Sequence, residues 1–248
     1  MTKKNRKKKK KKFGSRLINL LLFLLLLIGL ALVFNNQIKY LLMNWNANQY
    51  HTSKITKEDV KKNQKKKGNF DFSSVESLST EAVLRAQMDA QKLPVIGGIS
   101  MPDIGLNLPI FKGLSNHNLL LGAGTMKVDQ QMGEGNYALA SHFVTGQPRM
   151  LFSPLKEAPA RAGQTVYLTD KTDIFVYVVT DVFIVTPEHV EVLDDTPNKR
   201  ELTLVTCNDP GAIRRVIVRC DFKEKYPVEQ AKNNVTKAFE QPYNQIKW

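Results

Sequence analysis

Cys207 is the residue of this chain whose type and setting best fit a chemical role. It follows the strand-like run ELTLVT and opens the segment 208–213, so a sheet could hold the thiol rigidly while leaving it accessible. A thiolate is a strong nucleophile, and it needs an acid to protonate the leaving group. Cys220 lies inside the run VIVRCDF, which is typical of a small buried side chain. A disulfide between the two cysteines stays open as an alternative, although disulfide-stabilised domains usually carry more cysteines.

His142 is the histidine best placed to serve such a thiol, because it ends the apolar run YALAS and could face a cleft. Near neutral pH an imidazole can both donate and accept a proton, so it is the usual partner of a nucleophilic cysteine. A histidine at a strand end can equally be structural. The remaining histidines lie in polar or acidic segments, at His51, His117 and His189.

An arginine is expected beside the thiol, because Arg214 and Arg215 open the last strand-like run within eight residues of Cys207. A hairpin through 208–213 would bring one guanidinium close enough to stabilise an oxyanion and hold a substrate carbonyl. Strand alternation puts Arg215 and Arg219 on one face, which could also be a solvated surface. The sequence contains no metal-binding motif, phosphate-binding loop or dinucleotide fingerprint.

The elements that must position these residues read mainly as β-strands. Polar and apolar residues alternate with a period near two, and glycine, proline or aspartate separates the runs. The expected strands are 99–101, 106–111, 137–141, 164–169, 174–186, 201–206 and 215–222. Short helices are expected at 80–90, capped by Thr80 and Glu81, and at 119–121 and 150–155. Seven or eight short strands indicate a closed barrel or a sandwich.

The N-terminal third of the chain has the pattern of a membrane anchor. Residues 17–34 carry no charge and one polar side chain, and as a helix they span about 27 Å, close to the thickness of the hydrocarbon core. The run is longer than that of a cleaved signal peptide, and no A-x-A triplet follows it. Residues 1–16 carry ten basic side chains and no acidic one, which predicts a cytoplasmic N-terminus on a single-pass protein of the cell membrane.

Charge is therefore distributed by segment. The expected organisation is a cytoplasmic basic tail at 1–16, a transmembrane signal anchor at 17–34, a polar extracellular stalk or linker at 35–80, and a folded extracellular domain at 81–248. The formal net charge of +13 comes from the first 70 residues, while residues 71–248 carry 18 basic and 21 acidic side chains. A nucleic-acid-binding domain is a poor interpretation of a mildly acidic folded part.

Two motifs resemble a known family. TLVTC at 203–207, with Arg215 eight positions after the cysteine, and ALASH at 138–142 are similar to the motifs of the sortases. The resemblance runs from about residue 70 to 222, and it is to class A, the housekeeping group of Gram-positive bacteria, with the streptococcal enzymes nearest. It implies an eight-stranded β-barrel, and it makes 81–248 the catalytic domain of a cysteine transpeptidase.

The resemblance also implies roles for residues. Cys207 would attack the Thr carbonyl of an LPxTG-type sorting signal, cut the Thr–Gly bond and form a thioester. Arg215 would stabilise the oxyanion, with Thr206 helping to position the substrate. His142 would protonate the leaving amine and then deprotonate the incoming amine of a lipid II-type peptidoglycan precursor. The implied substrate contacts, any of which could be an ordinary core residue, are Met126, Ala140, Val192, Leu193, Thr203 and Val205.

The implied partners are secreted surface proteins that carry the sorting signal, the peptidoglycan precursor and the membrane, with no nucleic acid. No cofactor is expected. Some sortases bind calcium, and Glu134, Asn136 and Asp195 could supply oxygen atoms, but two ligand positions are Lys127 and Gln130. An ammonium group there opposes a divalent cation, so calcium is possible but not expected.

Three other functions stay open. A class C sortase, which polymerises pilins, usually has a second hydrophobic segment, whereas residues 223–248 are polar and have no assigned role. A non-catalytic surface-binding domain would keep its function without Cys207. A cysteine peptidase would use the same thiol for hydrolysis alone.

Overall fold

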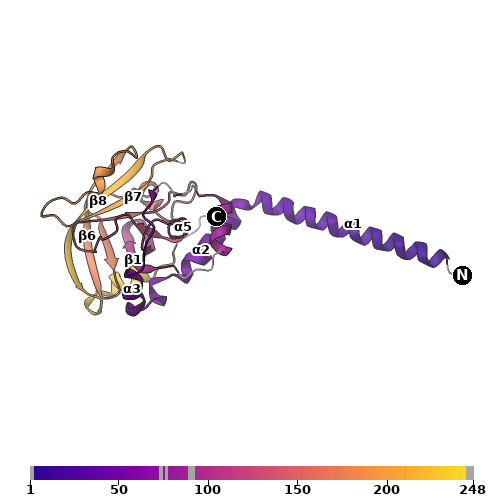
Figure 1. Cartoon of the computed structure of the whole chain (residues 1–248), viewed down its shortest axis with the longest axis horizontal. Helices are drawn as coiled ribbons and strands as arrows, with labels where there is room; N and C mark the ends of the chain where they lie inside the picture. The colour runs from indigo at the N-terminus through magenta and orange to yellow at the C-terminus, as the bar shows by residue number, and fades with distance from the viewer. Residues whose placement is uncertain (1–2, 73–74, 76–77, 89–92, 210, 244–248) are drawn as a thin grey trace. The chain divides into compact units, whose positions relative to one another are not determined.

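The computed structural model describes residues 3–72, 75, 78–88, 93–209 and 211–243, without the side chains of 3–14 and 86–88. The chain forms two compact units, Met1–Tyr40 and Leu41–Trp248. The first unit is dominated by helix α1 (Lys3–Val33), drawn in indigo in Figure 1. Its stretch Ser15–Val33 is long and apolar enough to cross a membrane, by length and composition. Helix α2 (Asn35–Gln49) follows α1 after a single residue, Phe34.

The second unit contains a closed β-barrel, as the resemblance implies (Figure 1). Around the barrel the strand order is β1-β2-β3-β4-β7-β8-β6-β5. Neighbouring strands are antiparallel except for the pairs β2–β3 and β4–β7, which are parallel. Among the described residues the strands are β1 (Val95–Met101), β2 (Leu106–Phe111), β3 (Ala123–Thr125), β4 (Asn136–Ala140), β5 (Thr165–Thr169), β6 (Asp173–Val185), β7 (Glu201–Cys207) and β8 (Arg215–Pro227).

Short helical elements join or cover the strands. The α-helices of the second unit after α2 are α3 (Lys57–Gln64), α4 (Thr80–Met88), α5 (Asn116–Leu121), α6 (Pro154–Glu157) and α7 (Asn233–Glu240). The 3-10 turns are η1 (Thr52–Lys54), η3 (Pro102–Ile104), η4 (Val190–Leu193) and η5 (Val228–Gln230). The expected helices at 80–90, 119–121 and 150–155 correspond to α4, α5 and the turns leading into α6, except that 89 and 90 lie outside the described residues. The cap of α4 differs from the expectation: the Ser79 hydroxyl, not that of Thr80, accepts a hydrogen bond from the Ala82 amide.

Two strand predictions need correction. β3 is absent from the expected strands, because its sequence Ala-Gly-Thr is too short to show alternation and contains glycine. β1 begins at Val95 rather than residue 99, and it includes Gly97 and Gly98. These glycines lie in the sheet because a Cβ at Gly97 would come within 2.3 Å of the Thr169 carbonyl oxygen. The neighbouring strand β5 therefore passes too close to β1 for any larger residue.

The parallel pair β4–β7 runs through the core. β7 is buried from Glu201 to Thr206, and β4 is buried from Asn136 to Leu139. Strands covered on both faces can be apolar without alternation, as β4 (NYALA) largely is. The buried threonines of β7, Thr203 and Thr206, are satisfied by hydrogen bonds to Asn136 and Ser141. Both strands become partly exposed at their last residues, Ala140 and Cys207, so the sheet delivers side chains to the barrel surface there.

The segment expected to be a stalk packs in part on the barrel. Met43 and Ala47 of α2 are fully buried, and the Tyr50 ring meets Phe111 of β2 edge-on, with 5.6 Å between centroids. From α3, Asn63 donates a hydrogen bond to the Val95 carbonyl of β1 at 2.9 Å. The compact unit thus begins at Leu41, not at residue 81. Composition concealed this packing, because a few buried side chains lie within a lysine-rich, polar run.

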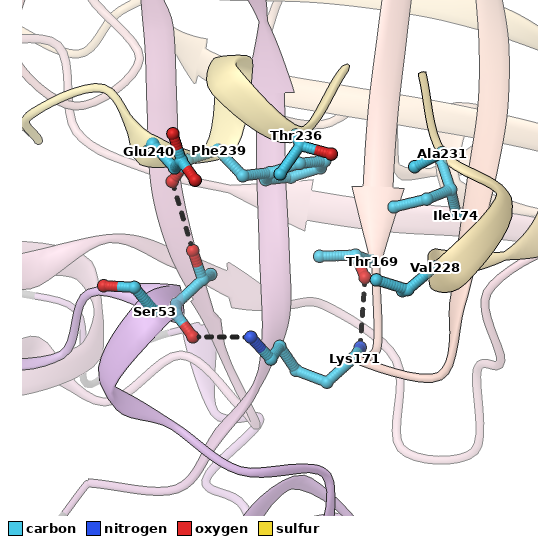
Figure 2. Close-up of a pocket in the computed structure, with 10 residues that line it drawn as sticks. Ser53, Thr169, Lys171, Ile174, Val228, Ala231, Thr236, Phe239 and Glu240 are labelled. Carbon is cyan, nitrogen blue, oxygen red and sulfur yellow. Dashed lines mark hydrogen bonds between the residues drawn. The ribbon is translucent and has the colours of Figure 1, made fainter. Parts of the chain in front are cut away.

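The C-terminal tail, which had no role in the sequence analysis, closes back onto this same segment. The Tyr243 hydroxyl accepts a hydrogen bond from the Thr52 amide at 2.8 Å, and the Tyr243 ring stacks on His51 at 4.4 Å between centroids. Figure 2 shows Phe239 of α7 facing a small pocket, with Lys171 reaching across to the backbone of η1. That lysine donates to the Thr52 carbonyl at 3.0 Å.

Candidate active site

The parallel pairing of β4 with β7 brings His142 next to Cys207. Ala140 is the register partner of Val205, and His142 and Cys207 lie two residues further along their respective chains. The Thr206 hydroxyl donates to the Ser141 carbonyl at 2.9 Å, so a hydrogen bond joins the two chains directly before His142 and Cys207. The two strand ends therefore hold the imidazole and the thiol at the same edge of the barrel.

The antiparallel pairing of β7 with β8 brings Arg215 beside the thiol, which confirms the expected hairpin. Cys207 and Arg215 are direct register partners across the two strands, as are Val205 and Ile217. In this structure the guanidinium is held by the connecting loop, since its Nη1 donates to the Ala212 carbonyl at 2.6 Å. The arginine is thus adjacent to the nucleophile, but it bonds protein carbonyl groups.

Asp209 orders the loop between the cysteine and the arginine. Its carboxylate accepts hydrogen bonds from the amides of Ile213 at 2.9 Å and Arg214 at 3.2 Å. The loop is closed at its base by the Asn208 amide, which donates to the Arg214 carbonyl at 2.9 Å. These backbone bonds place Ala212, and through it the Arg215 guanidinium, at the rim of the site.

Lys156 of α6 links the two segments that follow the histidine and the cysteine. Its ammonium donates to the Asn208 carbonyl at 2.5 Å and lies 4.7 Å from the centre of the Phe143 ring. Phe143 follows His142 directly, and Asn208 follows Cys207 directly. One side chain therefore connects both sides of the site, although nothing in the sequence pattern marked it.

A cavity of about 640 Å³ opens at this edge of the barrel, and His142, Cys207 and Arg215 all line it. Six of the seven expected substrate contacts line the same cavity: Met126, Ala140, Val192, Leu193, Val205 and Thr206. The wall is mainly apolar, as the walls of ligand-binding pockets usually are. An extended apolar segment could therefore lie against β4, β7 and η4 with one end at the thiol.

Thr203, the seventh expected contact, does not line the cavity. It is fully buried, and its hydroxyl donates to the Asn136 side-chain oxygen at 2.8 Å. The Asn136 amide in turn donates to the Val192 carbonyl at 3.0 Å. Thr203 thus supports η4, which contributes Val192 to the cavity wall, rather than touching a bound segment itself.

Several wall residues could not be expected from the sequence, because they come from distant parts of the chain. They include Phe72, Val75, Leu114, Leu119, Val185, Val190 and Ile217. Ile217 could have been found by parity, since it shares a strand face with Arg215. The others depend on how the β2–β3 connection, the end of β6 with the β6–β7 connection, and the segment before α4 fold over the sheet, and no local pattern predicts that.

Burial sets the resting protonation states of the site. It lowers the pKa of His142 to about 4, so the imidazole is neutral at pH 7. Burial raises the pKa of the Cys207 thiol, the Arg215 charge opposes that rise, and Asp209 adds to it. Cys220 is fully buried in β8 and is not bonded to Cys207; burial raises its pKa beyond the range of a reactive thiol. At neutral pH the resting pair is a thiol and a neutral imidazole.

The region considered for calcium contains a salt bridge. The Lys127 ammonium lies 2.5 Å from an Asp195 carboxylate oxygen, and that same oxygen accepts the Asn136 amide at 2.8 Å. Gln130 uses its side chain to bond the Lys127 amide and the Ala138 amide and carbonyl. These oxygen atoms already have protein partners, and a cation of the protein itself sits among them.

A thiol, an imidazole and a guanidinium at the rim of one apolar cavity on a closed barrel fit a cysteine-dependent acyl-transfer enzyme. Residues 99–223 match the family model described as the sortase domain. The chain is 52% identical over 231 residues to sortase A of Streptococcus agalactiae, covering 92% of this chain and 93% of that protein. It is 37% identical over 207 residues to sortase A of Listeria monocytogenes, covering 82% and 89% respectively. The chain belongs to the sortase family, and it is therefore a cysteine transpeptidase.

Solved structures of sortases share the fold of this chain. The crystal structure of Listeria monocytogenes sortase A aligns with a TM-score of 0.55 at 34% identity, covering 59% of this chain and 98% of that one. Sortase C-3 of Streptococcus pneumoniae aligns with a TM-score of 0.56 at 17% identity, covering 82% and 100%, which shows a shared fold alone. The sequence similarity to the sortase A proteins supports the class A, streptococcal-type resemblance.

Proposed function

We propose that this enzyme is anchored in the cell membrane, cleaves an LPxTG-type sorting signal between Thr and Gly, and transfers the surface protein to an amine of a lipid II-type peptidoglycan precursor. The observation that carries the proposal is the convergence of Cys207, His142 and Arg215 on one apolar cavity. The partners follow from that chemistry: a secreted protein with the signal, an amine acceptor and the membrane.

The first half-reaction forms a thioester. After its proton has passed to His142, the Cys207 thiolate attacks the Thr carbonyl carbon, and a tetrahedral oxyanion forms. The Arg215 guanidinium is the adjacent cation, and it would exchange its bond to the Ala212 carbonyl for one to the oxyanion. The carbon–nitrogen bond then breaks, and the His142 imidazolium gives its proton to the leaving glycine amine.

The second half-reaction reverses these roles. The incoming amine attacks the thioester carbon, His142 accepts the amine proton, and the Cys207 thiolate leaves as the new peptide bond forms. The thioester keeps the energy of the broken peptide bond, so the transfer needs no nucleotide cofactor. Water competes with the amine for the same thioester, and the apolar walls at Val205 and Ile217 disfavour water.

The protonation states limit how much of the enzyme is ready to react. Attack requires a Cys207 thiolate with a His142 imidazolium, whereas burial favours the uncharged pair. At any pH the reactive form is therefore a minority, and it is most populated between the two pKa values. A bound substrate would increase the population of the reactive form in two ways. It would displace solvent from the site, and it would contact Arg215.

The membrane topology is part of the proposal. The stretch Ser15–Val33 would span the bilayer, and the basic side chains before it would hold the N-terminus in the cytoplasm. The catalytic unit would then lie outside, where both the secreted substrate and the lipid-linked acceptor are available.

The test is product analysis with the full chain in detergent micelles. An LPxTG-containing peptide is supplied with and without a soluble glycine-type amine. We expect cleavage at Thr–Gly that requires Cys207 and Arg215, with most of the acyl product diverted to the amine. If added amine does not change the hydrolysis products, a peptidase is favoured. The absence of cleavage would favour a binding domain. Joining of pilin-like substrates through lysine would favour class C.

A further inference from the structure

Helix α2 has two apolar faces, one of which is used by the catalytic unit. Met43 and Ala47, four residues apart, are fully buried in that unit. Leu41 and Trp45, also four apart, are 52% and 63% exposed. Side chains with this spacing lie above one another on a helix, so the exposed pair forms a stripe. Ile38, three residues before Leu41, extends the same stripe by helical spacing and is 40% exposed.

The position of this stripe in the chain limits what can cover it. Val33 ends the apolar stretch of α1, and Leu41 and Trp45 follow it by eight and twelve residues. Helical chains of those lengths reach about 12 and 18 Å. The headgroup layer begins where the hydrocarbon core ends and is about 5–8 Å thick on each side. With α1 in the bilayer, both side chains are tethered within those distances of the hydrocarbon core, so a helix that runs along the membrane surface can bring both into that layer.

We propose that α2 lies on the membrane surface, with Leu41 and Trp45 inserted at the boundary between headgroups and acyl chains of the outer leaflet. This inference rests on the membrane anchoring proposed above. Tryptophan is enriched at that boundary, because its ring is apolar and its indole N–H remains hydrated.

The opposite face of α2 is bonded to the catalytic unit, so contact of α2 with lipid would also orient that unit. Asn48 of α2 accepts a hydrogen bond from the Tyr243 amide at 3.4 Å, and the Asn48 carbonyl accepts the Lys54 ammonium at 2.9 Å. Together with buried Met43 and Ala47, these bonds fasten α2 to the catalytic unit. A lipid-bound α2 therefore fixes the tilt of the barrel, and with it the direction in which the cavity opens toward a lipid-linked acceptor.

The direct test places a single tryptophan on each of two equally exposed sites. The full chain with Trp248→Phe, reconstituted in phosphatidylglycerol–phosphatidylethanolamine vesicles, reports on Trp45 alone, since the chain has two tryptophans. The control carries Trp45→Phe, Trp248→Phe and Val128→Trp, because Val128 is 59% exposed. We expect iodide to quench Trp45 at least threefold less than Trp at 128, and brominated lipids to quench Trp45 strongly.

Two results would overturn the inference. Equal iodide quenching at both sites would show that water covers α2. Protection from iodide without quenching by brominated lipid would show that protein, such as a second copy of the chain, covers it. Flotation of the same samples keeps the two proposals apart: a chain that does not float with vesicles contradicts the anchoring, whereas a floating chain with a water-exposed Trp45 contradicts only the surface helix.

A functional arm uses Trp45→Glu, with Gln64→Glu on α3 as a control of equal charge change at another exposed helical position. We expect Trp45→Glu to slow transfer to an amine carried on a lipid headgroup by severalfold, and to leave transfer to a soluble amine unchanged. Gln64→Glu should leave both unchanged. Lipid-linked transfer by Trp45→Glu at the wild-type rate would contradict an orienting role for α2.

Discussion

At the scale of single residues, the site is controlled by burial and by two charges of opposite sign near one thiol. The Cys207 thiol is partly covered, which disfavours its thiolate, while Arg215 favours the thiolate and Asp209 disfavours it. His142 is kept neutral by its surroundings. A thiol that is hard to ionise resists random oxidation and alkylation, so reactivity awaits the substrate.

Alkylation of Cys207 by iodoacetamide should report these charges. We expect slow modification at pH 7 that accelerates toward alkaline pH, because burial raises the thiol pKa. Arg215→Ala should slow modification at pH 8 by severalfold, since it removes the charge that lowers that pKa. Asp209→Asn should speed it, since it removes a charge that raises the pKa and keeps side-chain oxygen for the loop amides. Changes of the opposite sign, measured by intact mass, would refute this electrostatic description.

Lys156 is expected to act as a positioning residue. Lys156→Met removes the bond to the Asn208 carbonyl, and we expect kcat to fall about tenfold with little change in KM, because one lost hydrogen bond to a charged group is worth about 1.5–3 kcal/mol. Lys156→Arg keeps the charge and should recover much of the rate. If Lys156→Arg behaves like Lys156→Met, or if KM alone changes, the lysine has no such role.

At the scale of elements, the chemistry depends on the edge of the barrel where β4 and β7 end and β8 begins. Alternation and strand length were sufficient to predict most strands, and the β7–β8 hairpin could be derived because the loop after Cys207 is short. Two features could not be predicted from local pattern. β3 has three residues and no alternation, and the wall formed by Val185, Val190 and Leu114 depends on long-range folding.

The contact of the C-terminal tail with η1 should stabilise the catalytic unit. Tyr243→Phe leaves the buried Thr52 amide without its partner, at an expected cost of about 1–3 kcal/mol. Tyr243→Ala also removes a fully buried ring and should cost about 3–5 kcal/mol. Urea unfolding of the full chain in micelles measures both. Equal stability of wild type and Tyr243→Ala would show that the tail is not part of the cooperative unit.

Calcium should have little effect on this enzyme. The Lys127–Asp195 salt bridge places an ammonium group among the oxygen atoms that a cation would need. We expect millimolar calcium to leave the rate and Tm unchanged. A severalfold rise in rate or a shift of several degrees would contradict this expectation.

At the scale of the whole molecule, the excess of basic side chains and the catalytic residues lie in different segments of the chain. The basic side chains gather before and just after the apolar stretch, and the catalytic barrel is mildly acidic. The boundary between them proved harder to predict than either part, because residues 41–72 look like a linker by composition and yet pack on the barrel.

The central claim is that Cys207 carries the cleaved surface protein as a thioester, and intact mass spectrometry tests it most directly. The full chain in micelles is mixed with an excess of an LPxTG peptide and quenched in acid. We expect a mass increase equal to the peptide fragment ending in Thr, which disappears on adding a glycine-type amine or hydroxylamine and is absent from Cys207→Ala. Cleavage of the peptide by Cys207→Ala, or wild-type turnover without any adduct on Cys207, would contradict the claim.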